Sequence, residues 1–272
     1  MASSVRDKVV LITGGARGIG AETARQLVEG GARVALLDRD GPGVKATATA
    51  LGERAVGFEA DVTDTASLAD AVAATVQRFG GIDVVVANAG IAGPTASVAS
   101  VDPAAFEQVL EINLLGVWKT VRAALPQVVA RRGYVLVIAS VAAMIPTPTV
   151  AAYGMSKAGV ESFGRSLRIE LAPSGTDVGV AYFGVINTDM ARDILTIPAL
   201  DQLIAALPGK LGAPTPLPEA GAAIVRGINR RAAIVYAPRW VPALIALRGL
   251  APLSDRLLGR MKTMTRMLAD TR

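Results

Sequence analysis

KVVLITGGARGIG, residues 8–20, runs from a short string of Val, Leu and Ile straight into a glycine-rich turn. Glycine lets a backbone turn sharply and approach a pyrophosphate closely, and the N-terminus of a following helix points free N–H groups at phosphates. The spacing is Gly-x-x-x-Gly-x-Gly rather than the Gly-x-Gly-x-x-Gly fingerprint of dinucleotide-binding loops. Its place between a strand pattern and a helix pattern still favours a dinucleotide site over a plain turn. The residues predicted to line this site are Gly14, Arg17, Gly18, Ile19 and Gly20.

Short apolar runs alternate with helical patterns along the rest of the chain. The strand patterns cover 8–13, 33–38, 55–60, 82–87, 133–139, 178–183 and 232–236. The helical patterns lie near 18–30, 65–80, 103–131, 153–172 and 217–230. Strands that are apolar on both sides must be covered on both faces, so this alternation predicts a doubly wound parallel α/β sheet of seven strands. With 272 residues, of which 51% are hydrophobic, we expect a single domain.

The composition excludes several kinds of chemistry. The chain has no Cys and no His, which removes disulfides, thiolate nucleophiles, zinc sites and the commonest general base. No metal site is therefore expected, and Ser, Tyr, Lys, Asp, Glu or a cofactor must do the chemistry. The N-terminal apolar run is too short for a signal peptide or a membrane span, which favours a cytoplasmic location.

The net charge of +5 comes from the C-terminal end of the chain. Residues 226–272 hold ten Lys and Arg but two Asp, so the earlier part is slightly acidic. Aromatic residues make up 4% of the chain, and no basic stripe is interleaved with them. Nucleic-acid binding is therefore not expected.

A carboxylate ends the second strand pattern. Asp38 follows Gly20 by eighteen residues, the place where a dinucleotide fold accepts hydrogen bonds from the adenosine ribose and repels a 2′-phosphate. This position favours NAD over NADP. Arg17 and Arg39 can pair with a 2′-phosphate, so NADP stays open, as does a plain solvated carboxylate.

Tyr153 and Lys157 stand four positions apart in YGMSK, residues 153–157. Positions i and i+4 of a helix share a face, so an ammonium there can stabilise a phenolate by Coulomb attraction. Tyr153 could then exchange a proton with an alcohol oxygen without any histidine. Such a pair also arises by chance, and Ser140 alone would fit a helix cap. However, Ser140 ends the fifth strand pattern, at the sheet edge where ligands of open α/β folds bind, and the conjunction predicts a catalytic site.

Together these motifs resemble the short-chain dehydrogenase/reductase family, a large group of NAD(P)-dependent oxidoreductases with a Rossmann-type fold. The resemblance covers roughly residues 6–190. It rests on TGGARGIG, Asp61-Val62, Asn88-Ala89-Gly90, Asn113 in EINLLG, Ser140, YGMSK and VINTDM at 185–190.

The resemblance implies a role for each matching position. Tyr153 would be the general acid/base, while Lys157 would bind the nicotinamide ribose and lower the tyrosine pKa. Ser140 would hydrogen-bond the substrate oxygen as charge develops on it, and Asn113 would hold a water that links Lys157 to solvent. Asp61 and Val62 would contact the adenine of the cofactor. The turn Asn88-Ala89-Gly90 would support the sheet and border the cofactor. Ile186 and Thr188 would hold the nicotinamide carboxamide.

The sequence departs from the family pattern at two positions. The family usually has proline before the glycine at 184, where this chain has Phe183, and that change could reshape the floor of the nicotinamide pocket. Residue 87 is Ala where Asn is common, a change that we expect to be tolerated.

Residues 184–216 interrupt the alternation, being too rich in proline for one regular element and too apolar for a linker, which predicts a flap over a pocket. This flap and VAAMIPTPTVAA, residues 141–152, are dominated by Ala, Met, Ile, Leu and Pro. Such a lining favours an apolar alcohol or ketone, for instance a steroid, terpenoid or lipid-derived compound. The alternative is that these side chains bury against one another or against another subunit.

The catalytic domain is expected to span 1–238 and to carry a helical extension over 239–272. From Ser254 a helical wheel separates apolar from basic positions. This basic amphipathic helix either packs on protein or lies on an anionic membrane surface, which would make the protein peripherally membrane-associated. The apolar positions are Leu257, Leu258, Met261, Met264 and Leu268, and the basic ones are Arg256, Arg260, Lys262 and Arg266.

The sequence therefore predicts an NAD-preferring oxidoreductase that transfers hydride between the nicotinamide and a hydrophobic secondary alcohol or ketone. One alternative is a 3-oxoacyl-thioester reductase, which the family also contains and which would be expected to prefer NADPH. Another is a non-catalytic nucleotide-sensing or membrane-docking protein. The resemblance also implies a homotetramer or homodimer built through the helices at 103–131 and 153–172. The exact substrate, its stereochemistry and the direction of the reaction are not set by the sequence.

Overall fold

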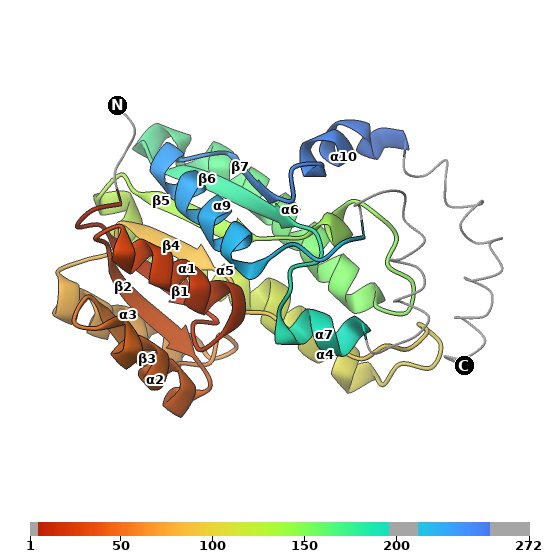
Figure 1. Ribbon diagram of the computed structural model, residues 1–272, viewed down its shortest axis with the longest axis horizontal. Helices are drawn as coiled ribbons and strands as arrows, with labels where there is room; N and C mark the ends of the chain where they lie inside the picture. Colours follow the sequence, from red (N-terminus) through yellow and green to blue (C-terminus); the bar gives the residue numbers. More distant parts are fainter. Residues whose placement is uncertain (1–4, 196–211, 251–272) are drawn as a thin grey trace.

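A seven-stranded parallel sheet forms the centre of the computed structural model, which describes residues 5–195 and 212–250 (Figure 1). The strand order is β3-β2-β1-β4-β5-β6-β7, and every pairing is parallel. The predicted doubly wound α/β fold is thus confirmed. The strands are β1 (Val9–Thr13), β2 (Arg33–Asp38), β3 (Ala55–Glu59), β4 (Val84–Ala87), β5 (Tyr134–Ile138), β6 (Asp177–Phe183) and β7 (Ile234–Ala237).

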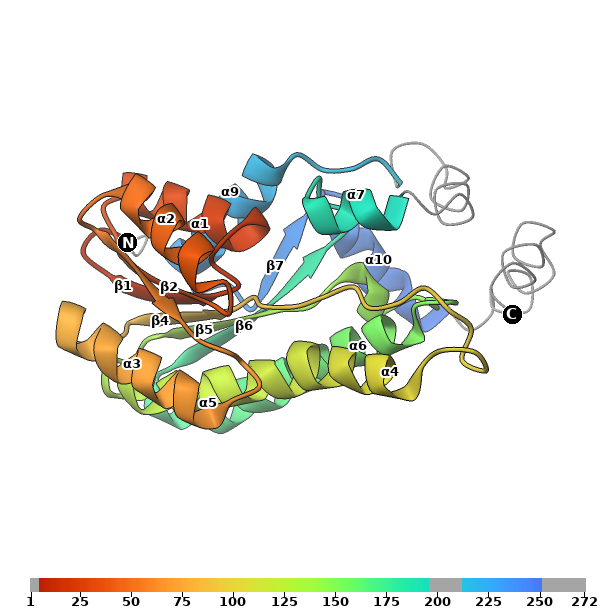
Figure 2. The same cartoon turned by 90° about the horizontal axis from the view of Figure 1, so that it is seen from below.

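Helices cover both faces of the sheet, as Figure 2 shows from below. Because side chains alternate along a strand, Leu11 faces one helix layer and Ile12 the other, and both are fully buried. One layer holds α1 (Gly18–Glu29), α2 (Gly41–Leu51) and α9 (Leu217–Arg230). The other holds α3 (Thr65–Phe79), α4 (Pro103–Leu110), α5 (Gly116–Ala130) and α6 (Ala151–Leu171).

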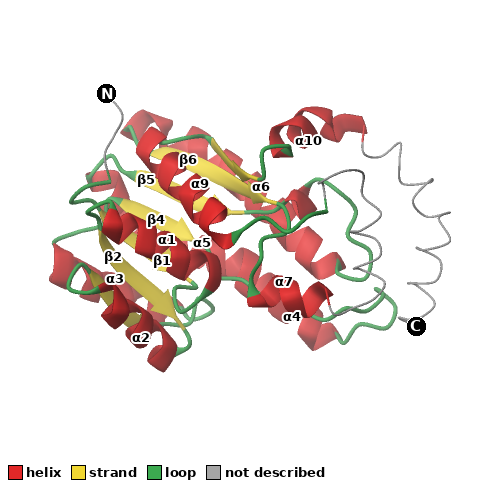
Figure 3. Cartoon of the chain, in the orientation of Figure 1, coloured by secondary structure: helices red, strands yellow, loops and turns green. Residues whose placement is uncertain are grey.

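The strand order reverses between β1 and β4. The chain runs outward from β1 to β3, returns to pair β4 with β1, and then runs outward again to β7. In open parallel sheets, a crevice opens at such a reversal outside the carboxyl ends of the strands, and ligands bind there. Figure 3 shows the loops in green that gather beyond these strand ends, around α7 (Asp189–Leu195) and α10 (Val241–Leu247).

The predicted helix over 103–131 contains a turn of π-helix. It consists of α4 (Pro103–Leu110), the π-helical turn Glu111–Leu115 and α5. One extra residue is therefore inserted into the hydrogen-bond pattern of the helix before α5 begins. Single π turns inside α-helices are frequent at functional sites. Here the turn centres on Asn113, one of the predicted catalytic residues.

Helix α2 was not predicted from the sequence. Its first turn, Gly41-Pro42-Gly43, is typical of a loop. Asp40 nevertheless caps the helix, because its carboxylate accepts a hydrogen bond from the Gly43 N–H at 2.9 Å. Proline fits the first turn, where its missing N–H would have no partner in the helix anyway.

The predicted flap and the predicted extension are described in part. Within 184–216, the structure shows α7 and a bridge between Ile186 and Thr215. Within 239–272, it shows α10 and the short 3₁₀ turn η4 (Arg248–Leu250). The amphipathic helix predicted from Ser254 lies outside the described residues. None of the described helices is long and apolar enough to cross a membrane.

Candidate active site

The glycine loop after β1 is folded too tightly for any other residue at two positions. A Cβ on Gly20 would lie 2.1 Å from the carbonyl oxygen of Gly14, and one on Gly14 would lie 2.9 Å from Asn88 Nδ2. Gly14 and Gly18 also have positive φ angles of 68° and 59°. No side chain caps the start of α1, because Arg17 makes no such bond. The first N–H groups of α1 therefore stay available for an anion, and the loop fits a pyrophosphate.

Asp38 lies against this loop at the end of β2. Its Oδ2 accepts the Ala16 N–H at 3.0 Å and its Oδ1 accepts the Asp40 N–H at 3.1 Å. Each oxygen keeps a second lone pair for a ribose hydroxyl. Arg17 and Arg39 are both exposed beside it. The carboxylate therefore sits where sequence reasoning placed it, within reach of the adenosine end of a dinucleotide.

The turn after β4 fastens β4 to the glycine loop. Asn88 Nδ2 donates to the carbonyls of Thr13 at 2.9 Å and Gly14 at 3.2 Å. In return, Thr13 Oγ1 accepts the N–H groups of Asn88 at 3.1 Å and Ala89 at 3.2 Å. Thr13 was missed by the sequence analysis because a threonine that ends a strand has no distinguishing pattern.

Asp61 and Val62, the predicted adenine contacts, lie in the turn after β3. Asp61 is exposed, and its Oδ1 accepts both the N–H and the hydroxyl of Thr63 at 2.8 Å. Val62 is buried against Gly116 at the start of α5. The turn is thus rigidly held by its own hydrogen bonds and by α5.

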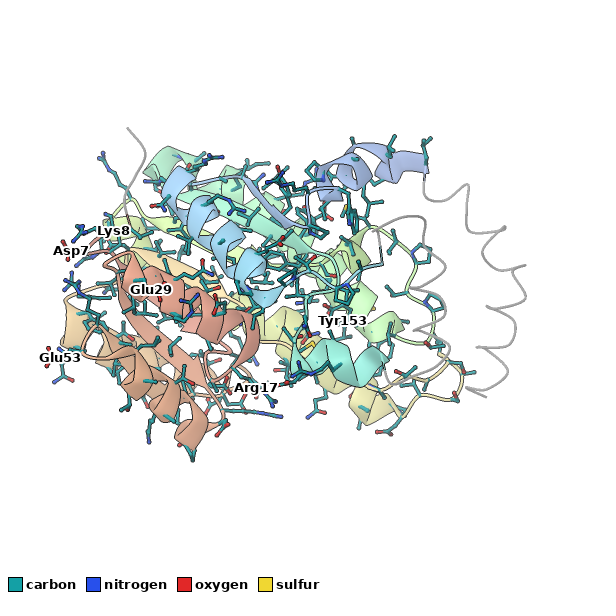
Figure 4. All side chains as sticks on the ribbon, in the orientation of Figure 1. Asp7, Lys8, Arg17, Glu29, Glu53 and Tyr153 are labelled. Atoms are coloured by element: carbon teal, nitrogen blue, oxygen red, sulfur yellow. The ribbon has the colours of Figure 1, made fainter. Side chains whose placement is uncertain are left out.

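Tyr153 and Ser140 meet at the carboxyl edge of the sheet. Tyr153 is in the first turn of α6, and the side chain of Ser140, which follows β5, is near enough to its hydroxyl to lower the Tyr153 pKa. Ser140 Oγ also donates to the Phe183 carbonyl at 3.2 Å and accepts the Ala142 N–H at 3.1 Å. Figure 4 shows Tyr153 and Arg17 on this side of the sheet, whereas Asp7 and Lys8 lie at the opposite end.

Lys157 lies one turn after Tyr153 on the same face of α6, as predicted. Its Nζ is 5.6 Å from the centre of the Tyr153 ring and donates to the Ile138 carbonyl at 3.0 Å. The side chain is buried, and burial lowers the pKa of the Lys157 ammonium to about 8.

The pKa of Tyr153 moves in the direction opposite to the one expected. Burial raises the pKa of the Tyr153 hydroxyl above its ordinary value, and the Ser140 side chain offsets that rise in part. Sequence reasoning counted the attraction of the ammonium and not the cost of removing a phenolate from water. The hydroxyl of the protein alone is therefore a neutral phenol, which is the form of a general acid.

Asn113 completes this cluster from the π-helical turn. It is fully buried, its Oδ1 accepts the Ile91 N–H at 2.8 Å, and its Nδ2 donates to the Ile91 carbonyl at 2.8 Å. A Cβ on Gly90 would lie 3.1 Å from Asn113 Oδ1 and 3.6 Å from Lys157 Nζ. Asn113 and Lys157 thus face each other across Gly90.

Ser156, a residue that sequence reasoning did not single out, links Asn113 to the catalytic helix. Its hydroxyl donates to the Tyr153 carbonyl at 2.7 Å and accepts from Asn113 Nδ2 at 3.3 Å. The only signal in the sequence was its place inside YGMSK.

The loop after β6 brings Ile186 and Thr188 toward the glycine loop. A Cβ on Gly18 would lie 3.8 Å from Thr188 Cγ2, so the two ends of a cofactor site come together. Thr215 braces this loop, since its N–H donates to the Val185 carbonyl at 2.7 Å and its carbonyl accepts the Asn187 N–H at 2.9 Å. Thr215 was also missed, because its partner strand is a single bridge.

Phe183, the departure from the family pattern, is buried on the α9 side of the sheet. The neighbouring Gly184 donates its N–H to the Ala237 carbonyl at 2.9 Å. A Cβ on Gly184 would lie 3.0 Å from Pro238 Cδ and 3.3 Å from Trp240 Cζ2. The turn at Phe183-Gly184, predicted to floor the nicotinamide pocket, is therefore supported by the segment after β7.

The segment that leads into α6 is mainly apolar. Residues 141–150 form a 3₁₀ turn and a loop, and the Ala96 N–H donates to the Thr149 carbonyl at 2.9 Å. A very small pocket between this loop, the start of α6 and the segment before α4 is lined by Pro94, Ala96, Val98, Val101, Phe106, Thr149, Ala151 and Ala152. Among the described residues, no group of three or more acidic side chains could hold a metal ion.

A phenol that can give up a proton, placed beside a pyrophosphate-binding loop at the switch point of the sheet, serves hydride transfer between a nicotinamide and an alcohol carbon. The fold and the site therefore define a dinucleotide-dependent oxidoreductase. More specifically, the chain belongs to the short chain dehydrogenase family, whose sequence model matches residues 8–197. The family uses NAD or NADP and acts on CH–OH groups.

Named relatives agree with this assignment. The chain is 35% identical over 211 residues to 2-(R)-hydroxypropyl-CoM dehydrogenase of Xanthobacter autotrophicus, covering 75% of this chain and 84% of that protein. It is 36% identical over 198 residues to cis-4-hydroxycyclohexanecarboxylate dehydrogenase of Sinomonas cyclohexanicum, covering 71% and 79% respectively. It also superposes with a TM-score of 0.78 on 3-ketoacyl-(acyl-carrier-protein) reductase from Brucella melitensis complexed with NADH, at 27% identity over 86% of this chain and 98% of that one.

Proposed function

We propose that this dehydrogenase transfers hydride between NAD and a hydrophobic secondary alcohol or ketone, with Tyr153 as general acid/base. The observation that carries the proposal is the placement of the Ser140 side chain beside the Tyr153 hydroxyl, with the Lys157 ammonium held one turn away. All three groups lie at the carboxyl edge of the sheet, where a dinucleotide would present its nicotinamide.

The chain's own residues move the proton and hold the reactants. When bound, NAD would supply the hydride acceptor for oxidation, and NADH the hydride donor for reduction. In oxidation, Tyr153 must be in its phenolate form to take the hydroxyl proton of the alcohol as the carbon loses its hydride; in reduction, the neutral phenol gives that proton to the ketone oxygen. The Ser140 hydroxyl would donate to the same oxygen after turning away from the Phe183 carbonyl. The buried Lys157 ammonium offsets the charge on the phenolate, and Asn113 faces it from the π-helical turn.

The cofactor proposed is NAD rather than NADP. Asp38 places a carboxylate beside the N-terminus of α1, held there by the N–H groups of Ala16 and Asp40. A 2′-phosphate would meet this negative charge at close range, whereas ribose hydroxyls would donate hydrogen bonds to it.

The apolar composition of residues 141–152 supports a hydrophobic substrate of the steroid, terpenoid or lipid-derived kind. The names of the two dehydrogenases above describe hydroxy compounds, which agrees with an alcohol as substrate. The similarity to a 3-ketoacyl-(acyl-carrier-protein) reductase keeps a 3-oxoacyl thioester as the second candidate.

One experiment distinguishes an apolar alcohol or ketone substrate from a 3-oxoacyl thioester. The absorbance of NADH and NADPH is followed against a panel of apolar ketones, secondary alcohols and 3-oxoacyl thioesters. We expect turnover with the apolar ketones and NADH, and a loss of at least about 10³-fold in kcat for Tyr153→Phe with NADH affinity unchanged. Full activity of Tyr153→Phe would overturn the proposed mechanism, and NADH binding without turnover across the panel would favour a non-catalytic nucleotide sensor.

We also propose that the protein assembles through α5 and α6. Large apolar side chains are exposed on the outer faces of these helices and of the π-helical turn, where water would otherwise cover them. They are Leu115, Trp118, Met155 and Ile169. A dimer or tetramer in solution is expected by light scattering, and a charged residue at Trp118 should weaken it. Membrane contact by residues 251–272 stays a prediction from the sequence.

A further inference from the structure

A buried carboxylate follows the catalytic pair along α6. Tyr153, Lys157, Glu161 and Arg165 succeed one another at four-residue intervals, so all four lie near one face of the helix. The Glu161 side chain is 7% exposed, although a carboxylate is rarely buried without a reason. The mechanism proposed above does not use it.

Three groups from three elements converge on Glu161. Arg165 on α6 lies 3.4 Å from Oε1, and Arg248 on η4 forms an ion pair with the same oxygen. The Tyr182 hydroxyl on β6 is near enough to the carboxylate to interact with it, and burial together with the charge of Glu161 raises the pKa of Tyr182 to about 12. The carboxylate therefore joins the catalytic helix, the strand beneath it and the segment after β7.

Both distant partners are connected to the active site. Tyr182 directly precedes Phe183, whose carbonyl accepts the Ser140 hydrogen bond. Arg248 belongs to the segment 238–250, in which Val241 and Leu244 pack into the same apolar core as α6. This segment lies beyond residues 8–197, which match the family model.

We propose that Glu161 is a positioning residue for the catalytic pair Tyr153–Lys157. Its ion pair with Arg248 determines how much of the negative charge of Glu161 acts on that pair. By holding Glu161, Arg248 fixes α6 against β6 and neutralises a negative charge one helical turn from Lys157. The segment after β7 thereby adjusts how readily the Tyr153–Lys157 pair releases a proton. This inference rests on the proposed function, because it concerns the same acid/base group.

Removing the charge of Arg248 and removing the charge of Glu161 should shift the protonation of Lys157 and Tyr153 in opposite directions. Without Arg248, the negative charge of Glu161 is less compensated and favours the protonated forms of Lys157 and Tyr153. Without Glu161, Arg248 contributes an uncompensated positive charge and favours their deprotonated forms. Within residues 5–195 and 212–250, the other charged or titratable groups that face Glu161 are Arg165 and Tyr182, and neither is altered by these changes.

The test is the pH dependence of kcat for alcohol oxidation, in the full chain with NAD. We expect Glu161→Gln to move the apparent pKa of the Tyr153–Lys157 pair down, and Arg248→Met to move it up, each by about half a pH unit. The double variant should return the profile to near that of the unaltered protein. Arg165→Met is the matched control, because it removes a guanidinium from the same carboxylate at a more exposed position and should shift the profile less.

A merely structural role would lower activity and melting temperature without moving the profile. Shifts in one direction for both variants, or no shift in either, would overturn the inference. If Arg248→Met does not fold, Arg248→Gln replaces it, and Glu161→Gln alone must still shift the profile downward. Arg248→Lys keeps the charge and should leave the profile unchanged. Failure of the proposed function would show differently, as full activity of Tyr153→Phe or no turnover by the unaltered protein.

Discussion

Lys157 Nζ lies 5.6 Å from the centre of the Tyr153 ring and donates its hydrogen bond to the carbonyl of Ile138, at 3.0 Å, at the end of β5. The ammonium is thus fixed by the sheet and not by the phenol. Because Lys157 is buried and Tyr153 is partly buried, the pKa of the lysine is lowered and that of the tyrosine is raised. Burial thus shifts each group toward its neutral form, but a lysine with a pKa of about 8 still carries its proton at pH 7.

Burying Lys157 makes the stability of the protein depend on pH. The folded-state pKa is about 8 against an ordinary value of 10.5, so the unfolded chain holds the proton more tightly. The cost is fully present below pH 8 and is lost as the pH rises from 8 to 10.5. We therefore expect Lys157→Met to be more stable than the unaltered protein at pH 7, by about 2 kcal/mol after the loss of the bond to Ile138.

Denaturant unfolding of both proteins at several pH values measures this difference. The advantage of Lys157→Met should shrink between pH 8 and 10.5 and change sign near the upper end. Other groups that titrate in this range are present in both proteins and largely cancel. A variant that is less stable at pH 7, or a difference that does not vary with pH, would contradict the prediction.

Asp38 should decide the choice between NAD and NADP. Asp38→Ser removes the negative charge beside the loop and leaves Arg17 and Arg39 free to pair with a 2′-phosphate. We expect the ratio of kcat/KM for NADPH to that for NADH to rise by about 100-fold. Arg39→Ser in the same background should reverse part of this rise. An unchanged ratio in Asp38→Ser would show that the carboxylate holds only the loop.

The sheet and the catalytic pair could be predicted because short-range patterns determine them. The apolar runs that became β1 to β7 are continuous, which a strand covered on both faces requires, and glycines mark the switch from β1 to α1. The spacing of Tyr153 and Lys157 places them on one helix face whatever surrounds them.

The missed features depend on long-range contacts or on capping. Helix α2 depends on one carboxylate, Asp40, overriding a first turn of glycines and proline. Thr13, through its hydroxyl, and Thr215, through its backbone, hold the site by hydrogen bonds to segments remote in sequence. The raised pKa of Tyr153 follows from burial, which the spacing of the pair does not reveal. The ion pair between Glu161 and Arg248 joins positions 87 residues apart, a separation that no local pattern covers.

Gly20 should be indispensable for cofactor binding. A methyl group there would lie 2.1 Å from the Gly14 carbonyl oxygen, so Gly20→Ala must push the loop out of its phosphate-binding shape. We expect NADH affinity, measured by fluorescence titration, to fall by at least about 10-fold. Gly249→Ala is the control, because a Cβ at Gly249 meets nothing within 4 Å, and it should bind NADH normally. Equal affinity in both variants would show that the loop can rearrange.

Asn113 should matter for both folding and turnover. Asn113→Ala leaves the N–H and the carbonyl of Ile91 without their side-chain partner in a buried place, which should cost about 2–4 kcal/mol of unfolding free energy. Thr120→Val is the matched control: its buried hydroxyl has no hydrogen-bond partner among the described residues, so an isosteric apolar side chain should cost less than about 1 kcal/mol. In Asn113→Ala we also expect kcat to fall more than the affinity for NADH, because the side chain that faces Lys157 across Gly90 is lost while the glycine loop is untouched. Unfolding curves and steady-state rates at 25 °C decide the matter, and a variant that loses stability but keeps its full kcat would restrict Asn113 to holding the Ile91 turn.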